Sequence, residues 1–326
     1  MDTSAVMGFT NSLFNLINRE RPNYLAVAFD KGGSVDRSEI YTEYKANRPE
    51  TPEAIRIAVP YIQALLEAMN IPIIEKEGYE ADDIIGTLAK QAENEGFDVY
   101  MMTPDKDFAQ LVSPNIFMYL PSRKGNGIEI WGVKEVQEKF DIEHPDQVID
   151  YLGMMGDSVD NIPGLPGVGD KTAKKFIKQY GSLENLLQNA HEVTGKLGEK
   201  ILDNKELGVL SKKLAKIILD VPIDYNLDEF KLSDPDKDIV LKVFDELEFR
   251  RIKETFFKIF GTNSSQLEKK GAEVVQGDLF SETYNLDSNK ENLDESKSIY
   301  QIIESFEELK LLVEKMMEQE LSLIHI

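Results

Sequence analysis

Acidic residues gather in four short segments of the sequence, each where we expect a strand to end or a helix to begin. In chain order they are Asp30, then Glu80, Asp82 and Asp83, then Asp105 and Asp107, and finally Asp157 and Asp160. Carboxylates brought close together repel one another unless they are neutralised, and such hard oxygen ligands suit Mg²⁺ or Mn²⁺. Two ions about 4 Å apart can bind a phosphate ester, generate a hydroxide nucleophile and stabilise the leaving oxygen. The motifs therefore predict metal-dependent hydrolysis of a phosphate ester.

Each acidic residue taken alone has a simpler explanation. Asp and Glu in the first turn of a helix commonly cap it or complement its dipole. The spacings E-x-D-D, D-x-D and D-x-x-D, met one after another at element junctions, favour a shared site over this explanation.

The elements that must bring these segments together follow from the spacing of apolar residues. Short apolar runs at 24–29, 71–74 and 99–102 predict buried strands, and apolar spacings of three and four predict helices over 52–69 and 81–95. The carboxyl ends of parallel strands share one edge of a sheet, where ligands bind. Further along, the pattern is helical with glycine-rich turns. The chain is therefore predicted to be α/β, with a central, mainly parallel sheet followed by a helical region.

The composition excludes several other kinds of site. The chain has no cysteine, which excludes disulfides and thiolate metal sites and indicates a reducing, cytoplasmic setting. Its three histidines, His144, His191 and His325, are scattered, which argues against a histidine-rich zinc site or a Ser-His-Asp triad. The sequence has no signal-peptide pattern and no apolar run of about 18 residues, so neither secretion nor a membrane is expected.

The net charge of −22 does not exclude a nucleic-acid partner. Residues 263–326 hold 6 Lys and Arg against 14 Asp and Glu, which leaves −14 for residues 1–262. Eight of the acidic residues in that part belong to the four motifs, and two bound divalent cations would reverse the local sign. Binding of DNA phosphates is therefore a question of local patches rather than of total charge.

Three of the acidic segments carry a specific resemblance. They read Gly-Tyr-Glu-Ala-Asp-Asp-Ile-Ile-Gly over 78–86, Thr-Pro-Asp-Lys-Asp-Phe over 103–108 and Gly-Asp-Ser-Val-Asp-Asn-Ile-Pro-Gly over 156–164. Their order and intervals resemble those of the 5′ nucleases of bacterial DNA polymerase I and their flap-endonuclease relatives, over about residues 1–260. The resemblance implies a PIN-like core that binds two Mg²⁺ or Mn²⁺ ions.

The same resemblance implies different metal-binding roles for the acidic residues. Asp30, Glu80, Asp82 and Asp105 would serve the first ion, Asp83 and Asp107 would orient ligands or waters, and Asp157 and Asp160 would serve the second ion.

A glycine-spaced turn opening onto a helix, at 164–173, resembles the longer-turn helix-hairpin-helix of the 5′ nucleases. Exposed amide groups at a helix start can cradle a phosphate, and in the family K⁺ often bridges hairpin carbonyls and DNA. Lysines at helical spacing follow the hairpin. Lysines along one face of a helix are usually only solvent-exposed. Next to the hairpin, however, they favour sequence-independent binding of duplex DNA. The residues expected to contact DNA are Gly164, Gly167, Val168, Gly169, Lys171, Thr172, Lys174, Lys175 and Lys178.

The segment 36–52 interleaves basic and aromatic residues and matches the family's arch over the active site. By the resemblance, Lys45 and Arg48 would hold the scissile phosphate as catalytic residues. Arg37 and Tyr44 would contact DNA, the tyrosine by stacking on an unpaired base. The alternative is an ordinary exposed helix whose tyrosines pack inward.

The resemblance also divides the chain. We expect a catalytic core over 1–155, a helical DNA-binding region over 156–262, an acidic linker over 263–297 and the start of a 3′→5′ exonuclease-like domain over 298–326. The family's first strand, with a further metal-binding aspartate, has no counterpart here. The segment Leu321–Ile326 fits no expected continuation.

The predicted function is that of a 5′→3′ exonuclease and 5′-flap endonuclease. Its partners would be 5′-flap, nicked or branched DNA and RNA primer–DNA hybrids, and it would be a monomer fused to polymerase domains. One alternative is a remnant that binds DNA without cutting it, because the first metal-binding aspartate is absent. A Mg²⁺-dependent phosphatase is the other, against which the hairpin and its lysines argue.

Overall fold

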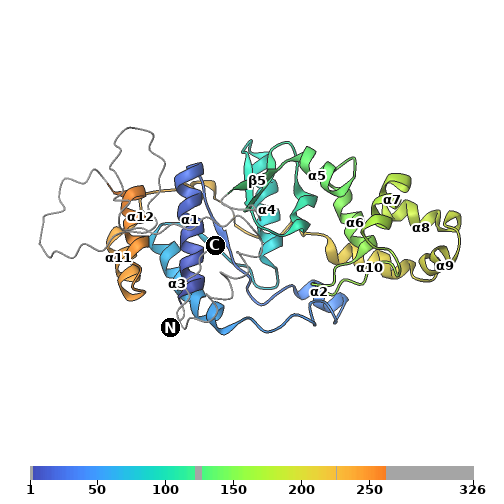
Figure 1. Ribbon diagram of the computed structural model, residues 1–326, viewed down its shortest axis with the longest axis horizontal. Helices are drawn as coiled ribbons and strands as arrows, with labels where there is room; N and C mark the ends of the chain where they lie inside the picture. The colour runs from blue at the N-terminus through green and yellow to red at the C-terminus, as the bar shows by residue number, and fades with distance from the viewer. Residues whose placement is uncertain (1–2, 122–126, 225, 262–326) are drawn as a thin grey trace, which may run out of the picture. The chain divides into compact units, whose positions relative to one another are not determined.

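The computed structural model describes residues 3–121, 127–224 and 226–261, which lie in one compact unit, Met1–Ser265 (Figure 1). The predicted linker at 263–297 and the predicted start of a further domain at 298–326 lie outside the described residues. None of the described helices is long and apolar enough to cross a membrane.

Within the described residues, five short strands form two small sheets. They are β1 Val27–Ala28, β2 Ile73–Ile74, β3 Val99–Met102, β4 Ile116–Pro121 and β5 Ile128–Trp131. The pairs β1–β2 and β3–β4 are parallel and β4–β5 is antiparallel. The α/β class and the mainly parallel pairing are therefore confirmed. The single central sheet is not found, because no ladder joins β1 to β3 within the described residues.

The predicted elements that carry acidic motifs lie where the apolar spacing placed them. The strand predicted at 99–102 is β3 without change, while β1 and β2 are shorter than the runs that predicted them. The predicted helices correspond to α3, Glu53–Ala68, and α4, Ala81–Asn94.

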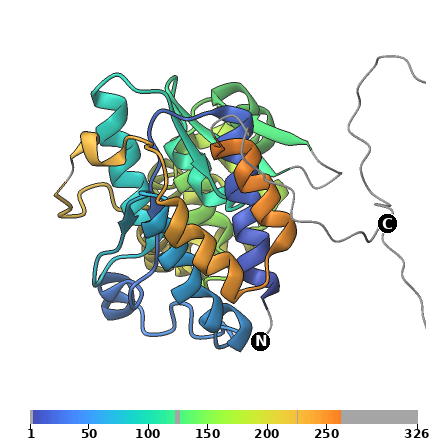
Figure 2. The same cartoon turned by 90° about the vertical axis from the view of Figure 1, so that its left-hand side faces the viewer.

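One hydrophobic core joins the two ends of the described unit. Its helices are α1 Ser4–Glu20, α3, α11 Lys237–Glu246 and α12 Arg250–Phe260. The rings of Phe14, Phe244 and Phe256 are almost fully buried, with centroids 5.8 to 6.2 Å apart. Figure 2 shows α1 in blue beside α11 and α12 in orange. The aromatic packing thus joins helices that are more than 200 residues apart in the sequence.

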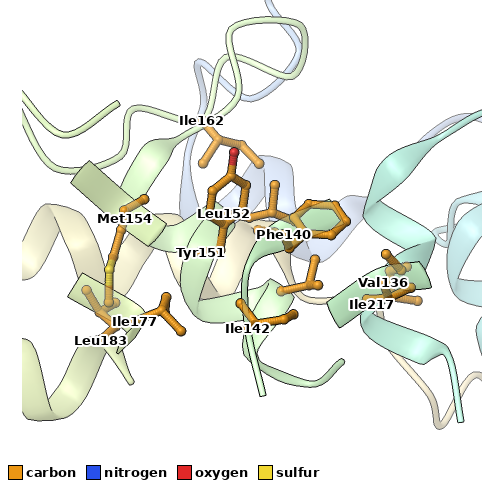
Figure 3. Close-up of a cluster of buried hydrophobic side chains, with 14 of the residues drawn as sticks. Val136, Phe140, Ile142, Tyr151, Leu152, Met154, Ile162, Ile177, Leu183 and Ile217 are labelled. Atoms are coloured by element: carbon orange, nitrogen blue, oxygen red, sulfur yellow. The ribbon is translucent and has the colours of Figure 1, made fainter. Parts of the chain in front are cut away.

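A second core joins the acidic motifs to the helical region. Its helices are α4, the 3₁₀ helix η1 Lys106–Leu111, α5 Val133–Phe140, α6 Gln147–Met155, α7 Asp170–Tyr180, α8 Leu183–Gln188, α9 Lys196–Asp203 and α10 Lys205–Ala215. Two short 3₁₀ helices are η2 Ala190–Glu192 and η3 Leu227–Phe230, and α2 spans Val35–Ile40. In Figure 3, Phe140 and Tyr151 meet edge to face, with centroids 5.3 Å apart, among aliphatic side chains from several helices. The predicted helical region is therefore packed onto the α/β part through one continuous core.

The helices α6 and α10 approach each other closely in this core. A Cβ added at Gly153 of α6 would lie 2.7 Å from Lys212 Cβ and 2.9 Å from Lys212 Cα of α10. Because backbone cannot move aside as a flexible side-chain end can, only glycine allows the two helices to approach this closely.

We expect Gly153→Ala to lower the free energy of unfolding by about 1 to 3 kcal/mol, because the added methyl group overpacks the α6–α10 contact. Gly8→Ala is the matched control: Gly8 lies in α1 with open space around its Cα. There the change should raise stability by about 0.5 to 1 kcal/mol through helix propensity. Urea denaturation of both variants measures the difference; equal effects would contradict the packing argument.

Candidate active site

The first two acidic motifs meet at the start of α4. Asp30 follows β1, and its Oδ1 accepts a hydrogen bond of 2.7 Å from the backbone N–H of Ala81 in the first turn of α4. The N–H of Glu80 donates to Asp83 Oδ2 at 3.4 Å, which closes the same turn. Unpaired amide groups and the positive end of the helix dipole favour carboxylates here, so the local fold itself places them together.

The third motif is shaped by a turn directly after β3. The N–H of Asp105 donates to Thr103 Oγ1 at 3.1 Å, and the N–H of Asp107 donates to Asp105 Oδ1 at 2.9 Å. The side chain of Asp105 is exposed and that of Asp107 is half-buried. Asp107 Oδ1 is buried without a hydrogen-bond partner among the described residues. A buried carboxylate oxygen without a donor is a fitting ligand for a cation.

The fourth motif lies on a tight loop between α6 and the glycine-spaced turn. Asp157 and Ile162 exchange backbone hydrogen bonds of 2.9 and 2.7 Å, and the N–H of Val159 donates to Asp157 Oδ1 at 2.7 Å. Gly156 and Gly164 lie back to back with φ of +76° and +66°, and a Cβ on either would collide with the other side of the loop. The loop is thereby held in one shape that presents Asp157 and Asp160.

A pocket of about 230 Å³ brings the third and fourth motifs together. Its lining residues are Arg48, Pro104, Asp105, Lys106, Asp107, Asp157, Val159 and Asp160. Lys106 Nζ lies 3.6 Å from Asp157 Oδ2.

Two cationic side chains connect this pocket with the start of α4. Lys45 Nζ lies 2.8 Å from Glu80 Oε1 and 3.6 Å from Asp160 Oδ2, and Arg48 forms an ion pair with Asp160. The backbone N–H of Lys45, whose φ is +55°, donates to the Asp160 carbonyl at 2.9 Å. Asn161 Nδ2 donates to the Glu43 carbonyl at 2.6 Å. The segment after α2 is therefore fixed against the fourth motif.

Burial and mutual repulsion dominate the electrostatics. Burial, followed by the charge of Asp105, raises the pKa of Asp82 to about 7. Burial, followed by the charges of Asp105 and Asp157, raises the pKa of Asp107 to about 7. A bound divalent cation would remove the cost of ionising both groups. As the side chains stand, no three acidic or histidine side chains of the described residues are close enough to form a complete metal site.

The glycine-spaced turn leads directly into α7. Gly167 has φ of +91°, and Gly169 forms the N-cap of α7. The hydroxyl of Tyr151 on α6 donates to Asp170 Oδ1 at 2.8 Å, which ties the start of α7 to α6. The side chain of Val168 is buried, so only its backbone is available to a ligand.

The four lysines of α7 fall into two classes. Lys174 pairs with Asp170 at 2.9 Å and Lys178 with Asp141 at 2.6 Å. Lys171 and Lys175 are exposed and form no ion pair within the described part of the chain. These two are the lysines best placed to meet an external phosphate.

Comparison with family models identifies the lineage of the chain. Residues 1–141 match the model described as "5′-3′ exonuclease, N-terminal resolvase-like domain", and residues 143–238 match "5′-3′ exonuclease, C-terminal SAM fold". The chain belongs to the 5′-3′ exonuclease family. The family indicated by the acidic motifs is therefore confirmed.

Relatives of this 5′-3′ exonuclease family member include free-standing and fused proteins. A 5′-3′ exonuclease of Aquifex aeolicus is 38% identical over 258 residues, covering 79% of this chain and 86% of the relative. DNA polymerase I of Bacillus caldotenax is 41% identical over 274 residues, covering 84% of this chain and 31% of the relative. The chain thus spans about a third of the length of such polymerases.

Solved structures share the fold of this 5′-3′ exonuclease family member at low identity. The catalytic core of Rad2 in complex with DNA substrate gives a TM-score of 0.58 at 19% identity, covering 79% of this chain and 86% of that one. T5 5′-exonuclease with bound zinc gives 0.56 at 19% identity, covering 78% and 89%. The PIN-like α/β fold is thereby confirmed.

Two residues expected to touch DNA are instead buried in this 5′-3′ exonuclease family member. Arg37 is 5% exposed and donates two hydrogen bonds of 2.7 Å to Asp83, besides contacts with backbone carbonyls. Tyr44 is 9% exposed, and its hydroxyl donates to Glu80 Oε2 at 3.1 Å. Burial, followed by the Glu80 charge, holds the pKa of Tyr44 well above its usual value, so the hydroxyl remains a donor. Arg37 cannot reach a phosphate here, and the Tyr44 ring cannot stack on a base.

Asp83 was expected to orient ligands or waters rather than to bind an ion directly. It is fully buried, and both its oxygens accept from Arg37. Asp83 Oδ1 also accepts from the N–H of Ile218 at 2.8 Å. Asp83 is therefore not a direct metal ligand in this arrangement.

Lys106 was missed by the sequence reasoning. It lines the pocket, and its position between the two acids of the D-x-D motif was the available signal.

We expect Asp107→Asn to raise the unfolding temperature of the chelator-treated protein at pH 8. The folded-state pKa of Asp107 is raised to about 7, so its ionised form is disfavoured by the fold above that pH; below about pH 4 this penalty disappears. The amide removes the penalty and should stabilise the metal-free protein by roughly 1 to 3 kcal/mol. With Mn²⁺ present the variant should gain less stability than the unaltered chain.

Circular dichroism melts with EDTA and with Mn²⁺ measure both effects. Asp224→Asn serves as a control, because Asp224 is exposed in the loop after Val221. An unchanged or lower melting temperature of Asp107→Asn in EDTA would contradict the electrostatic argument.

Proposed function

We propose that this member of the 5′-3′ exonuclease family hydrolyses phosphodiester bonds near the 5′ end of nicked, branched or flap DNA. The observation that carries the proposal is the 230 Å³ pocket, which is lined by Arg48 together with Asp105, Asp107, Asp157 and Asp160. Carboxylates facing a cationic side chain suit a phosphate bound through metal ions.

The donor set fits hard divalent cations. Asp30, Glu80, Asp82 and Asp105 would hold one Mg²⁺ or Mn²⁺, Asp157 and Asp160 would hold a second, and Asp107 would orient ligands between them. When bound, two such ions supply an activated water and stabilise the leaving oxygen. The partnerless Asp107 Oδ1 and the raised pKa values of Asp82 and Asp107 support this assignment, because both features are relieved by a cation.

Lys45 and Arg48 are the basic residues proposed to bind the scissile phosphate. Both now neutralise acidic side chains, Lys45 at Glu80 and Arg48 at Asp160. Once cations take over that neutralisation, the ammonium and guanidinium groups can donate to the scissile phosphate instead. The backbone contact between Lys45 and Asp160 keeps them at the pocket during this exchange.

The hairpin and α7 supply the grip on duplex DNA. The exposed side chains of Lys171 and Lys175 would neutralise backbone phosphates next to the amide groups at the start of α7. Carbonyls of the turn containing Gly167 are candidates for a K⁺ ion shared with a phosphate. Contacts of this kind read no sequence, so the substrate is selected by its structure.

The proposed setting is DNA replication and repair in the cytoplasm. Removal of RNA primers and trimming of 5′ flaps both require cleavage near a junction. The DNA polymerase I relatives, of which the matched part is about a third, support a chain that works next to polymerase domains. The chain would act as a monomer.

We expect Asp105→Ala to reduce metal-dependent cleavage of a labelled 5′-flap duplex by at least about 100-fold, which corresponds to roughly 3 kcal/mol of lost transition-state stabilisation. Asp105 is exposed at the pocket and would be a ligand to an ion that acts directly on the phosphate. Cleavage is followed with Mg²⁺, with Mn²⁺ and with chelator.

Asp238→Ala, an exposed acid in the first turn of α11, is the control and should cleave as the unaltered chain does. Flap binding by the unaltered chain without cleavage would overturn the proposed function in favour of a DNA-binding remnant. Hydrolysis of a phosphate monoester without DNA binding would favour a phosphatase.

Replacing Lys171 and Lys175 together by alanine should weaken flap binding and lower the slope of log affinity against log salt by about 2, because about 0.9 is lost per phosphate contact. Fluorescence anisotropy in Ca²⁺ over a range of salt concentrations measures the slope. The double variant Lys242→Ala and Lys258→Ala changes the charge equally on exposed positions of α11 and α12. An equal loss in both double variants would contradict a local grip by α7.

A further inference from the structure

Two buried polar side chains, those of Arg37 and Gln110, hold the segment that leaves α10, Leu214–Ile218. The last carbonyls of a helix have no partner within the helix and must find one elsewhere. Here Arg37 Nε donates to the Leu214 carbonyl at 3.1 Å and Arg37 Nη2 to the Lys216 carbonyl at 2.8 Å. Gln110 Nε2 donates to the Ala215 carbonyl at 3.0 Å. We call Leu214–Ile218 the α10 exit segment.

Arg37 joins the exit segment to the acids at the start of α4. Its guanidinium forms a two-point contact with Asp83 at 2.7 Å and a further contact with Glu80 at 3.4 Å. Asp83 in turn accepts from the N–H of Ile218 at 2.8 Å. Only a planar, multiply donating group can serve all of these acceptors at once. Arg37 thus contacts both acids at the start of α4 and two carbonyls of the exit segment at the same time.

Gln110 makes the equivalent connection to the third acidic motif. It is 7% exposed and lies on η1, three residues after Asp107. Its Nε2 donates to the Asp107 carbonyl at 3.0 Å as well as to Ala215, and its Oε1 accepts from the N–H of Ile217 at 3.0 Å. The backbone beneath Asp107 is therefore tied to the same exit segment.

The other part of α10 is tied to the hairpin. Ser211 Oγ accepts from the N–H of Gly164 at 2.9 Å, at the residue where the glycine-spaced turn begins. α10 also lies close against α6, since a Cβ added at Gly153 would lie 2.7 Å from Lys212 Cβ. One short helix thus runs from the proposed DNA grip to the backbone that carries the acidic motifs.

We propose that Arg37 and Gln110 are positioning residues that hold the acidic motifs in register with the hairpin through the α10 exit segment. They set the spacing between the metal-binding carboxylates and the site where the duplex backbone is gripped. Neither side chain touches DNA or metal. The inference rests on the proposed function, because it assigns the acids to metal ions and the hairpin to DNA.

The test compares Arg37→Lys and Gln110→Leu with Thr87→Val. Thr87 is fully buried on α4; its Oγ1 donates to the Ile218 carbonyl and accepts from the N–H of Val221, both at 3.3 Å. Thr87→Val therefore removes a buried polar contact to the same segment without touching an acid. Mn²⁺ affinity is measured by calorimetric titration without DNA, flap affinity by anisotropy in Ca²⁺, and kcat and KM by cleavage in Mg²⁺.

Arg37→Lys and Gln110→Leu should each weaken Mn²⁺ binding by about 10-fold or more, as loss of a group that orients metal ligands does. The value of kcat should fall while the flap dissociation constant stays within about 3-fold, because the hairpin surface is unchanged. Thr87→Val should lower the melting temperature and leave Mn²⁺ affinity unaltered.

Lower melting temperatures with unaltered Mn²⁺ affinity in all three variants would overturn the positioning role. Should Arg37→Lys fail to fold, Gln110→Leu decides, since it leaves no buried charge unpaired. An unaltered chain that binds Mn²⁺ but cuts no DNA would refute the proposed function, and the Mn²⁺ titrations would still decide the positioning role. No Mn²⁺ binding by the unaltered chain would overturn both.

Discussion

Electrostatic repulsion among the carboxylates is the unfavourable interaction that the rest of this structure must offset. The fold brings acidic side chains from four segments towards one another, and burial and neighbouring charges raise the pKa of Asp82 and Asp107. Such an arrangement costs stability unless cations offset it. The chain itself supplies two cationic side chains: Lys45 forms an ion pair with Glu80, and Arg48 forms one with Asp160. The remaining negative charge, and the partnerless oxygen of Asp107, are what a divalent ion would satisfy.

The sequence predicted the elements that carry the acids better than the contacts that hold them. β3 and α4 follow from runs and spacings within about 15 residues, and local hydrogen bonds such as the one from Asp107 to Asp105 follow from the motif itself. Arg37 was expected at the DNA because it lies in a basic, aromatic segment. Its burial depends on carbonyls 177 and 179 residues away, which no local pattern encodes.

The same distinction explains the sheet and the aromatic core. Apolar runs predict strands but do not state which strands hydrogen-bond, so one sheet was expected where two are found among the described residues. The packing of α1 against α12 joins Phe14 to Phe256, and helix spacing predicts only that each has an apolar face. The candidate metal-binding residues could be proposed from the sequence because their types and spacings are chemically unusual, whereas core contacts reuse common residues.

A buried ion pair such as Arg37 with Asp83 is weak evidence of stabilisation, because removing both groups from water costs about as much as their attraction returns. Well-packed apolar side chains could fill the same space at no electrostatic cost. What they could not do is bind two backbone carbonyls, an amide and a second carboxylate in fixed directions. The directional hydrogen bonds, rather than the charge attraction, explain why a guanidinium occupies this position. These hydrogen bonds position the acidic residues whose spacing matters for the proposed chemistry.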